Sequence, residues 1–250
     1  MIDSMMTYKL MMETHGQMTA LYHLLPTVQT CLNLVGDSEH TTKLTGELMD
    51  EEHFENAEAR DCFAAIAMMK GSKLLLSCVF GEYSAGEAIA RDLMNWTDNS
   101  FSIVFLTNAY LFSGVILANA AKARSQNKKG IKKVKKILKL LKKLVRHSEG
   151  LYDAQVRILE AEVDSLRGRW QHALQKYDQA TEKADEEKLY MLTGIAHEQA
   201  ANTLNSEGLH AEGMMHLASA IEAFQTWGAA AKVKQLSYRM ANLRVIPPRS

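Results

Sequence analysis

The sequence predicts an all-α protein, a right-handed α-solenoid of about four helix pairs preceded by an irregular helical segment. Gly and Pro make up only 17 of the 250 residues (14 Gly and 3 Pro), too little turn chemistry for an all-β sandwich. Apolar residues make up 47% and charged residues 23%, which is typical of a globular protein with a buried core. A pattern of small residues also recurs about every 40 residues, as in stacked helix pairs.

Changes in composition divide the chain into three parts. Residues 1–62 form the N-terminal helical segment, and residues 63–245 form the solenoid. Residues 246–250 form a tail that contains Pro247 and Pro248, neither of which can continue a helix.

The N-terminal segment carries a cluster of carboxylates between residues 37 and 61. These acids could complement a basic region elsewhere in the chain. Alternatively, those at 50–52 could occupy the first turn of a helix, where the macrodipole favours negative charge. The sequence leaves both alternatives open.

The cysteines and the N-terminus indicate an intracellular protein. The three cysteines are odd in number and far apart, as expected of reduced thiols rather than of a disulfide framework. The first residues lack the ordered basic, apolar and small-residue regions of a signal peptide. We therefore expect a cytoplasmic location.

Apolar periodicity and glycine turns predict four helix pairs in the solenoid. Their ranges are 63–80 with 83–95, 101–122 with 130–147, 151–167 with 170–184, and 188–206 with 210–226. One set of residues recurs in three of these pairs at offsets 0, 5, 9 and 12: Gly168, Ala173, Tyr177 and Ala180, then Gly208, Gly213, Leu217 and Ala220, and earlier Gly81, Gly86, Ala90 and Leu93.

The recurring residues have a packing role that follows from their size. A glycine lets the chain leave the first helix of a pair in a left-handed conformation. The small residues after it let paired helices approach closely, and Tyr177 fills the space between neighbours. Ala161 and Ala201 each precede a turn glycine by seven residues, where helices cross. The expected packing residues are Gly81, Ala161, Gly168, Trp170, Ala173, Tyr177, Ala180, Ala201, Gly208 and Ala220.

The second pair begins with a segment, residues 99–121, that contains no charged residue. Its length would suffice to cross a membrane. However, Asn108, Ser113 and Asn119 interrupt it, and unpaired amides are costly in hydrocarbon. We interpret the segment as a helix buried inside the helical array. A membrane span followed by a cytoplasmic polybasic helix is the alternative.

The second helix of that pair is strongly basic. Residues 122–147 contain ten Lys and two Arg and no acid, so the rest of this neutral chain carries a net charge of −12. Apolar residues at helical spacing make the helix amphipathic. Such a helix can bind an acidic protein or anionic lipid, or it can simply present a solvated basic face beside a core stripe. It has no interleaved aromatic residues, so we expect no nucleic-acid binding. The residues expected to contact a protein partner are Lys132, Lys133, Lys136, Lys139 and Lys143.

The spacing resembles the tetratricopeptide repeat, and the Gly168 unit matches best because Trp170 occupies the aromatic position. The distance of 40–44 residues exceeds the usual period of about 34 and implies longer helices. A longer pattern includes Leu32, Asn33, Leu34, Gly46, Glu47, Ile158, Leu159, Glu160, Ala161, Leu166, Gly168, Tyr177, His197, Glu198, Ala201, Trp227, Gly228, Lys232 and Val233.

This pattern, over residues 24–240, resembles the helical repeat region of very large signalling ATPases. Those proteins join a protein-kinase-like domain, an AAA-type NTPase, such a repeat array and often a sensor histidine kinase. The resemblance implies a regulatory or docking role in phosphorelay-type signalling. It also implies a protein partner, an ATPase or kinase domain in the same chain or in another.

No motif for catalysis accompanies the resemblance. The chain has no Gly-x-x-x-x-Gly-Lys-Ser/Thr run, so ATP hydrolysis is not implied here. The nine histidines lack metal-ligand spacing, and the closest pair, His210 and His216, would point in different directions on a helix. Glu160 and Glu162 cannot face each other, and we expect both on solvated faces.

We therefore predict a non-catalytic protein-interaction module without catalytic, cofactor-binding or metal-binding residues. The first helices of the pairs form its concave face, which we expect to dock a peptide or a neighbouring domain. The oligomeric state stays open.

Overall fold

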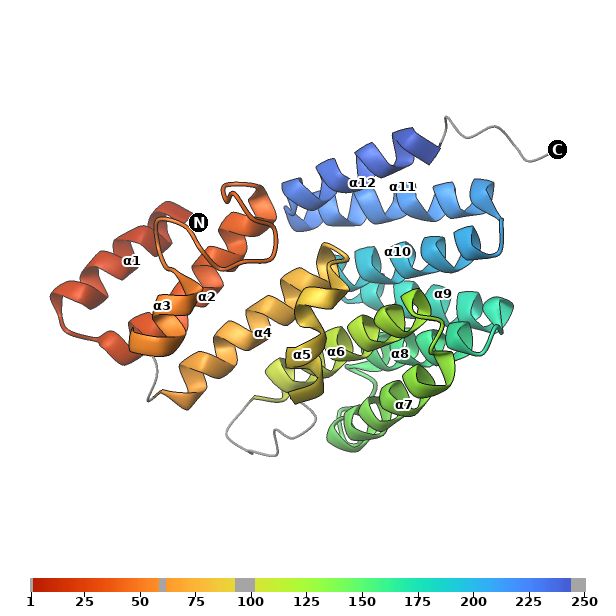
Figure 1. The fold of residues 1–250 in the computed structure, drawn as a ribbon, viewed down its shortest axis with the longest axis horizontal. Coiled ribbons are helices and arrows are strands. Elements are labelled where there is room, and N and C mark those ends of the chain that lie inside the picture. The colour runs from red at the N-terminus through yellow and green to blue at the C-terminus, as the bar shows by residue number, and fades with distance from the viewer. Residues whose placement is uncertain (1, 59–61, 93–101, 244–250) are drawn as a thin grey trace.

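The computed structural model describes residues 2–58, 62–92 and 102–243, and its only regular elements over these ranges are helices (Figure 1). The predicted tail at 246–250 and Leu93 lie outside the described residues. The predicted all-α class is confirmed for the described chain.

The helices follow one another with short connections. They are α1 (Ile2–Thr14), α2 (Met18–Val35), α3 (Glu51–His53), the π-helical turn η1 (Phe54–Glu58), α4 (Phe63–Val79), α5 (Tyr83–Asp92), α6 (Ile103–Ala123), α7 (Asn127–Leu144), α8 (Asp153–Leu166), α9 (Trp170–Glu186), α10 (Tyr190–Ser206), α11 (His210–Trp227) and α12 (Ala230–Leu243). The four predicted pairs correspond to α4 with α5, α6 with α7, α8 with α9, and α10 with α11. A further helix, α12, follows the fourth pair and has no counterpart in the predicted pattern.

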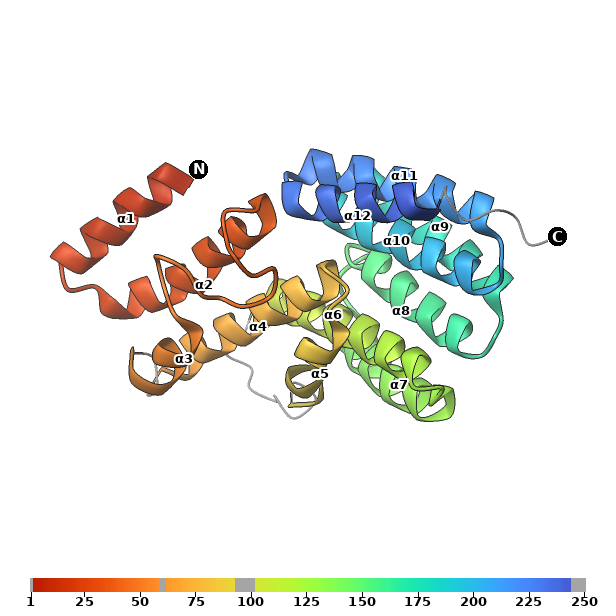
Figure 2. The same cartoon turned by 45° about the horizontal axis from the view of Figure 1, so that its top comes forward.

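Packing between neighbours along the chain dominates the arrangement, as predicted. In each of the four pairs the two helices contact each other. Successive pairs then stack, because α8 contacts both α6 and α7, and α10 contacts both α8 and α9. Figures 1 and 2 show α6 to α12 as one continuous stack of helices.

The predicted turn glycines follow α4, α8 and α10. Gly81, Gly168 and Gly208 have φ angles of 72°, 74° and 80°, the left-handed region that glycine adopts without a steric penalty. Five residues after two of these turns, the helices come very close. A Cβ added to Gly86 would lie 2.8 Å from a side chain of α6, and one added to Gly213 would lie 2.6 Å from a side chain of α10.

The uncharged segment is a core helix in this structure. α6 contacts α4, α5, α7 and α8, and a continuous run from Ala109 to Ala121 is buried. By length and composition alone, α6 is the one helix among the described residues that could cross a membrane. However, 67% of its most apolar stretch of 18 residues is buried inside the protein. Asn119 has partners within the fold, since its amide donates to Val115 O and to Gln199 Oε1, both at 2.9 Å, whereas the buried Ser113 hydroxyl has none among the described residues.

Of the two alternatives for the acidic cluster, the acids at 50–52 fit the second, because they lie at the start of a helix. Asp50 caps α3 by accepting a hydrogen bond from the His53 backbone N–H at 2.9 Å, and Glu51 lies in the first turn of that helix. Glu51 also accepts a hydrogen bond from Lys73 of α4 at 2.8 Å. Among the described acids of this cluster, no ion pair reaches α7.

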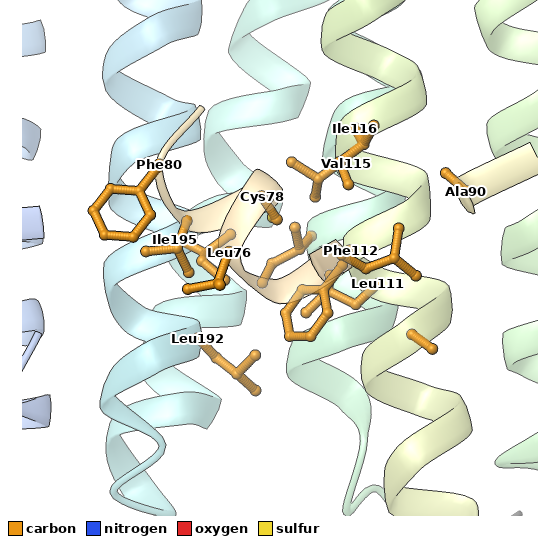
Figure 3. Packing of buried hydrophobic residues seen from close by; sticks show 14 of the residues in the cluster. Leu76, Cys78, Phe80, Ala90, Leu111, Phe112, Val115, Ile116, Leu192 and Ile195 are labelled. Atoms are coloured by element: carbon orange, nitrogen blue, oxygen red, sulfur yellow. The ribbon is translucent and has the colours of Figure 1, made fainter. Parts of the chain in front are cut away.

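The end of α4 lies against the inner face of the stack, the face formed by α6, α8 and α10. Figure 3 shows Leu76 and Cys78 between the apolar side chains of α6 and those of α10, with Phe80 on the side of α10 that is away from α6. Burial raises the pKa of the Cys78 thiol, which is 2% exposed. α4, one of the first helices expected to line the docking face, instead covers part of the face that α6, α8 and α10 form.

The second helix and the last helix of the described chain also meet. α2 contacts both α4 and α12. Gln235 of α12 donates a hydrogen bond of 2.9 Å to Phe80 O at the end of α4. The inner face is thus bounded by α4 on one side and α12 on the other, with α2 beside both (Figure 2).

Candidate functional site

The basic helix α7 packs on α6 and α8 through a narrow apolar stripe. Val134, Ile137 and Leu141 are fully buried. Gly130 provides the closest approach, since an added Cβ there would lie 2.5 Å from the Ala121 Cβ of α6. The rest of the helix surface is left to lysines.

Six exposed lysines form what we call the lysine face: Lys128, Lys132, Lys135, Lys136, Lys139 and Lys143. None of the six has an ion pair in the part of the chain that the structure describes. Five of them follow each other at steps of three or four residues, so they form a straight stripe of about 22 Å along α7.

Four of the five lysines predicted to contact a partner belong to the lysine face, whereas Lys133 does not. Lys133 is half-buried, and its charge helps to lower the pKa of Glu87 in α5. Burial alone would raise the pKa of Glu87, but the hydrogen bond from Arg124 and the charges of Arg91, Arg124 and Lys133 outweigh burial and lower it. Lys133 therefore serves the local charge balance between α5 and α7.

The lysine face destabilises the helix that carries it. Like charges at spacings of three and four repel, at about 0.2–0.5 kcal/mol a pair. In addition, Lys128 and Lys129 lie in the first turn of α7, which has no acidic residue to complement the positive end of the helix dipole. Of the six, only Lys143 complements the helix dipole, since it lies in the last turn of α7, and none of them makes an ion pair among the described residues.

The predicted packing residues lie at the helix contacts. Tyr177 is 1% exposed, and Trp170 is half-buried at the start of α9. The alanines, all fully buried, are Ala161, Ala173, Ala180, Ala201 and Ala220.

The expectation that Glu162 lies on a solvated face is wrong. Glu162 is fully buried in α8, where it accepts hydrogen bonds of 2.8 Å from Lys122 Nζ and from Tyr177 OH. Burial, followed by the Glu162 charge, raises the pKa of Tyr177 well above 10. The signal for this burial was present, because Glu162 stands four residues from both Ile158 and Leu166 in the apolar stripe of α8.

A second buried ion pair joins α10 to α12 and had no counterpart in the sequence analysis. Lys232 Nζ donates to Glu198 Oε1 at 2.8 Å and to Gln235 Oε1 at 2.9 Å. The same ammonium lies 5.7 Å from the centroid of the Phe224 ring, within cation–π range. Lys232 falls in an apolar stripe with Ala229 and Leu236, which is the same kind of signal as for Glu162.

These pairs lie beside a cavity of about 470 Å³ on the inner face. Tyr83, Asn119, Lys122, Glu198, Asn202 and Arg239 supply its polar lining. The buried Gln199 links two of these residues, since it accepts a hydrogen bond from Asn119 at 2.9 Å and donates one to Tyr83 OH at 3.1 Å. The cavity lies on the part of the inner face that α4 leaves uncovered.

The structure brings His216 to His197 rather than to His210. The Nδ1 atoms of His197 and His216 lie 3.0 Å apart across α10 and α11, so one ring donates to the other. Burial, and then the neighbouring His216, lowers the pKa of His197 to about 4. Burial also lowers the pKa of His216. The described residues contain no group of three metal-type ligands.

The lysine face and the inner cavity are thus two surfaces on which a ligand could act. A further pocket of about 620 Å³ lies beside the start of α7, where Lys128, Lys129 and Gly168 are among its lining residues. Compared with known proteins, the chain matches no family model, no curated protein and no solved structure.

Proposed function

We propose that the protein is a non-catalytic interaction module that binds an acidic segment of a partner protein through the lysine face of α7. The observation that carries this proposal is a stripe of exposed lysines with no ion-pair partner in the described chain, whose like charges repel one another along the helix. Complementary charge on a partner would relieve that repulsion.

The shape and composition of the lysine face favour an acidic helix over other anions. The exposed lysines are concentrated on α7, whereas the exposed residues of α9 include Asp178, Glu182 and Glu186. A rod-like partner with acids at the same spacing of three and four residues would match the stripe along its length. The face carries no aromatic side chains on which bases could stack, so nucleic acid is a poor fit.

The wider proposal keeps the architecture and setting implied by the family resemblance. The helix pairs would form a right-handed, tetratricopeptide-like solenoid in which α7 lies on the outside of the second pair. The partner would be an ATPase or histidine-kinase domain of a phosphorelay, in the cytoplasm. The left-handed glycine turns and the close approaches at Gly86 and Gly213 support the repeat architecture. The signalling partner rests on the resemblance alone.

Fluorescence anisotropy tests the proposal with a labelled helical peptide of about 20 residues that has glutamates at i, i+4, i+7 and i+11. We expect saturable binding that weakens between about 50 and about 300 mM NaCl. Replacing Lys132, Lys136, Lys139 and Lys143 together by Ser should weaken binding by at least about tenfold, with unchanged circular dichroism.

The matched control removes the same charge elsewhere, by changing Lys43, Lys183, Lys188 and Lys234 to Ser, and should bind as the wild type does. Equal loss in both variants would reduce the effect to net charge and overturn the site. Binding to vesicles of phosphatidylcholine and phosphatidylserine but not to the peptide would favour the membrane alternative, in which α6 is the candidate span.

A further inference from the structure

The cavity on the inner face has the size and the walls of a small-molecule site. Its volume of about 470 Å³ falls within the range of about 300–1,000 Å³ that is usual for such sites. Phe80, Ala123 and Leu236 supply apolar walls, and the polar side chains come from four separate elements. Such a mixture holds an organic molecule with one polar end.

The charges around the cavity leave one positive charge uncompensated. Glu162 is neutralised by Lys122, and Glu198 by Lys232, each through a hydrogen bond of 2.8 Å. Arg239 is the third cation. Its Nη1 lies 3.7 Å from Glu198 Oε1, too far for a hydrogen bond, and that carboxylate already serves Lys232.

The lining also offers more hydrogen-bond donors than the protein uses. Arg239 Nη2 donates to Asn202 Oδ1 at 2.6 Å, which leaves most of the five guanidinium N–H groups free. Tyr83 OH accepts from Gln199, while the described residues provide no acceptor for its own proton. Lys122 uses one of its three N–H donors on Glu162. An oxyanion is the group that satisfies several such donors at once.

We propose that this cavity binds a small organic anion, with its carboxylate or phosphoryl group on Arg239, Lys122 and Tyr83 and its apolar part against Phe80 and Leu236. The site is separate from the lysine face, so it does not depend on the function proposed above. A small molecule bound there would lie next to the contact between α4 and α12.

Ligand-observed NMR on the full chain tests this with three probes that share one ring: benzoate, phenyl phosphate and the neutral benzamide. We expect at least one anion to bind saturably, with a dissociation constant at or below about 1 mM, and benzamide to bind at least about tenfold more weakly. A preference between benzoate and phenyl phosphate would distinguish a carboxylate from a phosphoryl site. No saturable binding of either anion, or equal binding of benzamide, would overturn the proposal.

Two variants locate the site. Arg239→Gln should weaken anion binding by about tenfold, while Arg157→Gln, an arginine of similar exposure on α8, should leave it unchanged. Ala123→Phe fills the cavity without removing a charge and should abolish binding. Ala211→Phe, at an exposed position of α11, should leave binding unchanged. If Arg239→Gln does not fold, the Ala123 pair decides alone. Unchanged binding in Ala123→Phe would contradict the assigned cavity.

Discussion

The lysines of α7 and the lysines of the inner face carry the same charged group but differ in exposure and in ion pairing. On the outside, six ammonium groups stand exposed, with no ion pair among the described residues. On the inside, Lys122 and Lys232 each hold a buried carboxylate at 2.8 Å. A buried charge must be paired, so the inner lysines belong to the fold, whereas the outer ones are free for a partner. The two sets should respond to substitution in opposite directions.

The largest effect is expected at Lys232. Lys232→Met keeps the volume but leaves Glu198 buried without its main partner, which should cost about 3–5 kcal/mol of unfolding free energy. Urea denaturation followed by circular dichroism measures the loss. Lys234→Met, an exposed neighbour on the same helix, should change stability by less than about 0.5 kcal/mol. A similar small change at both positions would show that the inner pair does not stabilise the fold.

The next effect is a pH dependence from the histidine pair. The pKa of His197 is lowered to about 4 in the folded state, against about 6.5 in the unfolded chain. The unfolded state therefore binds more protons below pH 6.5, and stability falls from there toward pH 4. The wild type should lose about 2–3 kcal/mol more than His197→Gln over this range. Parallel stability curves for the two proteins would contradict the assignment.

An intermediate loss is expected at Glu162. Glu162→Gln keeps an acceptor for Tyr177 OH but removes the charge that holds Lys122. Lys122 is partly exposed and can turn toward water, so we expect a loss of only about 1–2 kcal/mol in urea titrations. A loss as large as that for Lys232→Met would mean that Lys122 cannot reach solvent.

The smallest effect has the opposite sign. Changing Lys132, Lys136, Lys139 and Lys143 together to Gln preserves helix propensity and removes like-charge repulsion. The protein should become more stable by about 0.5–1 kcal/mol at low salt, and the gain should shrink as salt is added. A net loss of stability would show that the lysines pack usefully and would weaken the case for a partner.

The sequence predicted the features that local spacing controls. Helical periodicity and the left-handed glycines at Gly81, Gly168 and Gly208 located the four helix pairs to within a few residues. α12 was missed because, although the left-handed Gly228 precedes it, Val233 and Met240 stand at two of the offsets where the pattern has small residues. Four of the five lysines predicted to contact a partner are exposed on α7, since the buried and exposed sides of an amphipathic helix follow from its period alone.

The features that escaped prediction depend on contacts between distant residues. His197 and His216 are 19 positions apart, and nothing in their spacing shows that α10 and α11 bring them together. Glu162 was assigned to solvent by its charge, although its apolar neighbours on the same stripe indicated burial. The cover that α4 provides over the inner face arises from long-range packing, which a repeat pattern cannot contain.

The contacts that join α12 to α2 and to the end of α4 have a consequence for how the protein folds. In an open array each repeat touches only its neighbours, so the ends can unravel separately. Here Gln235 holds Phe80 O, and an added Cβ on Gly36 would lie 3.7 Å from the Ala231 Cβ. Closing so long a loop raises contact order, which slows folding. It also couples the first helices to the last, so unfolding should be a single cooperative transition rather than a progressive loss from either end.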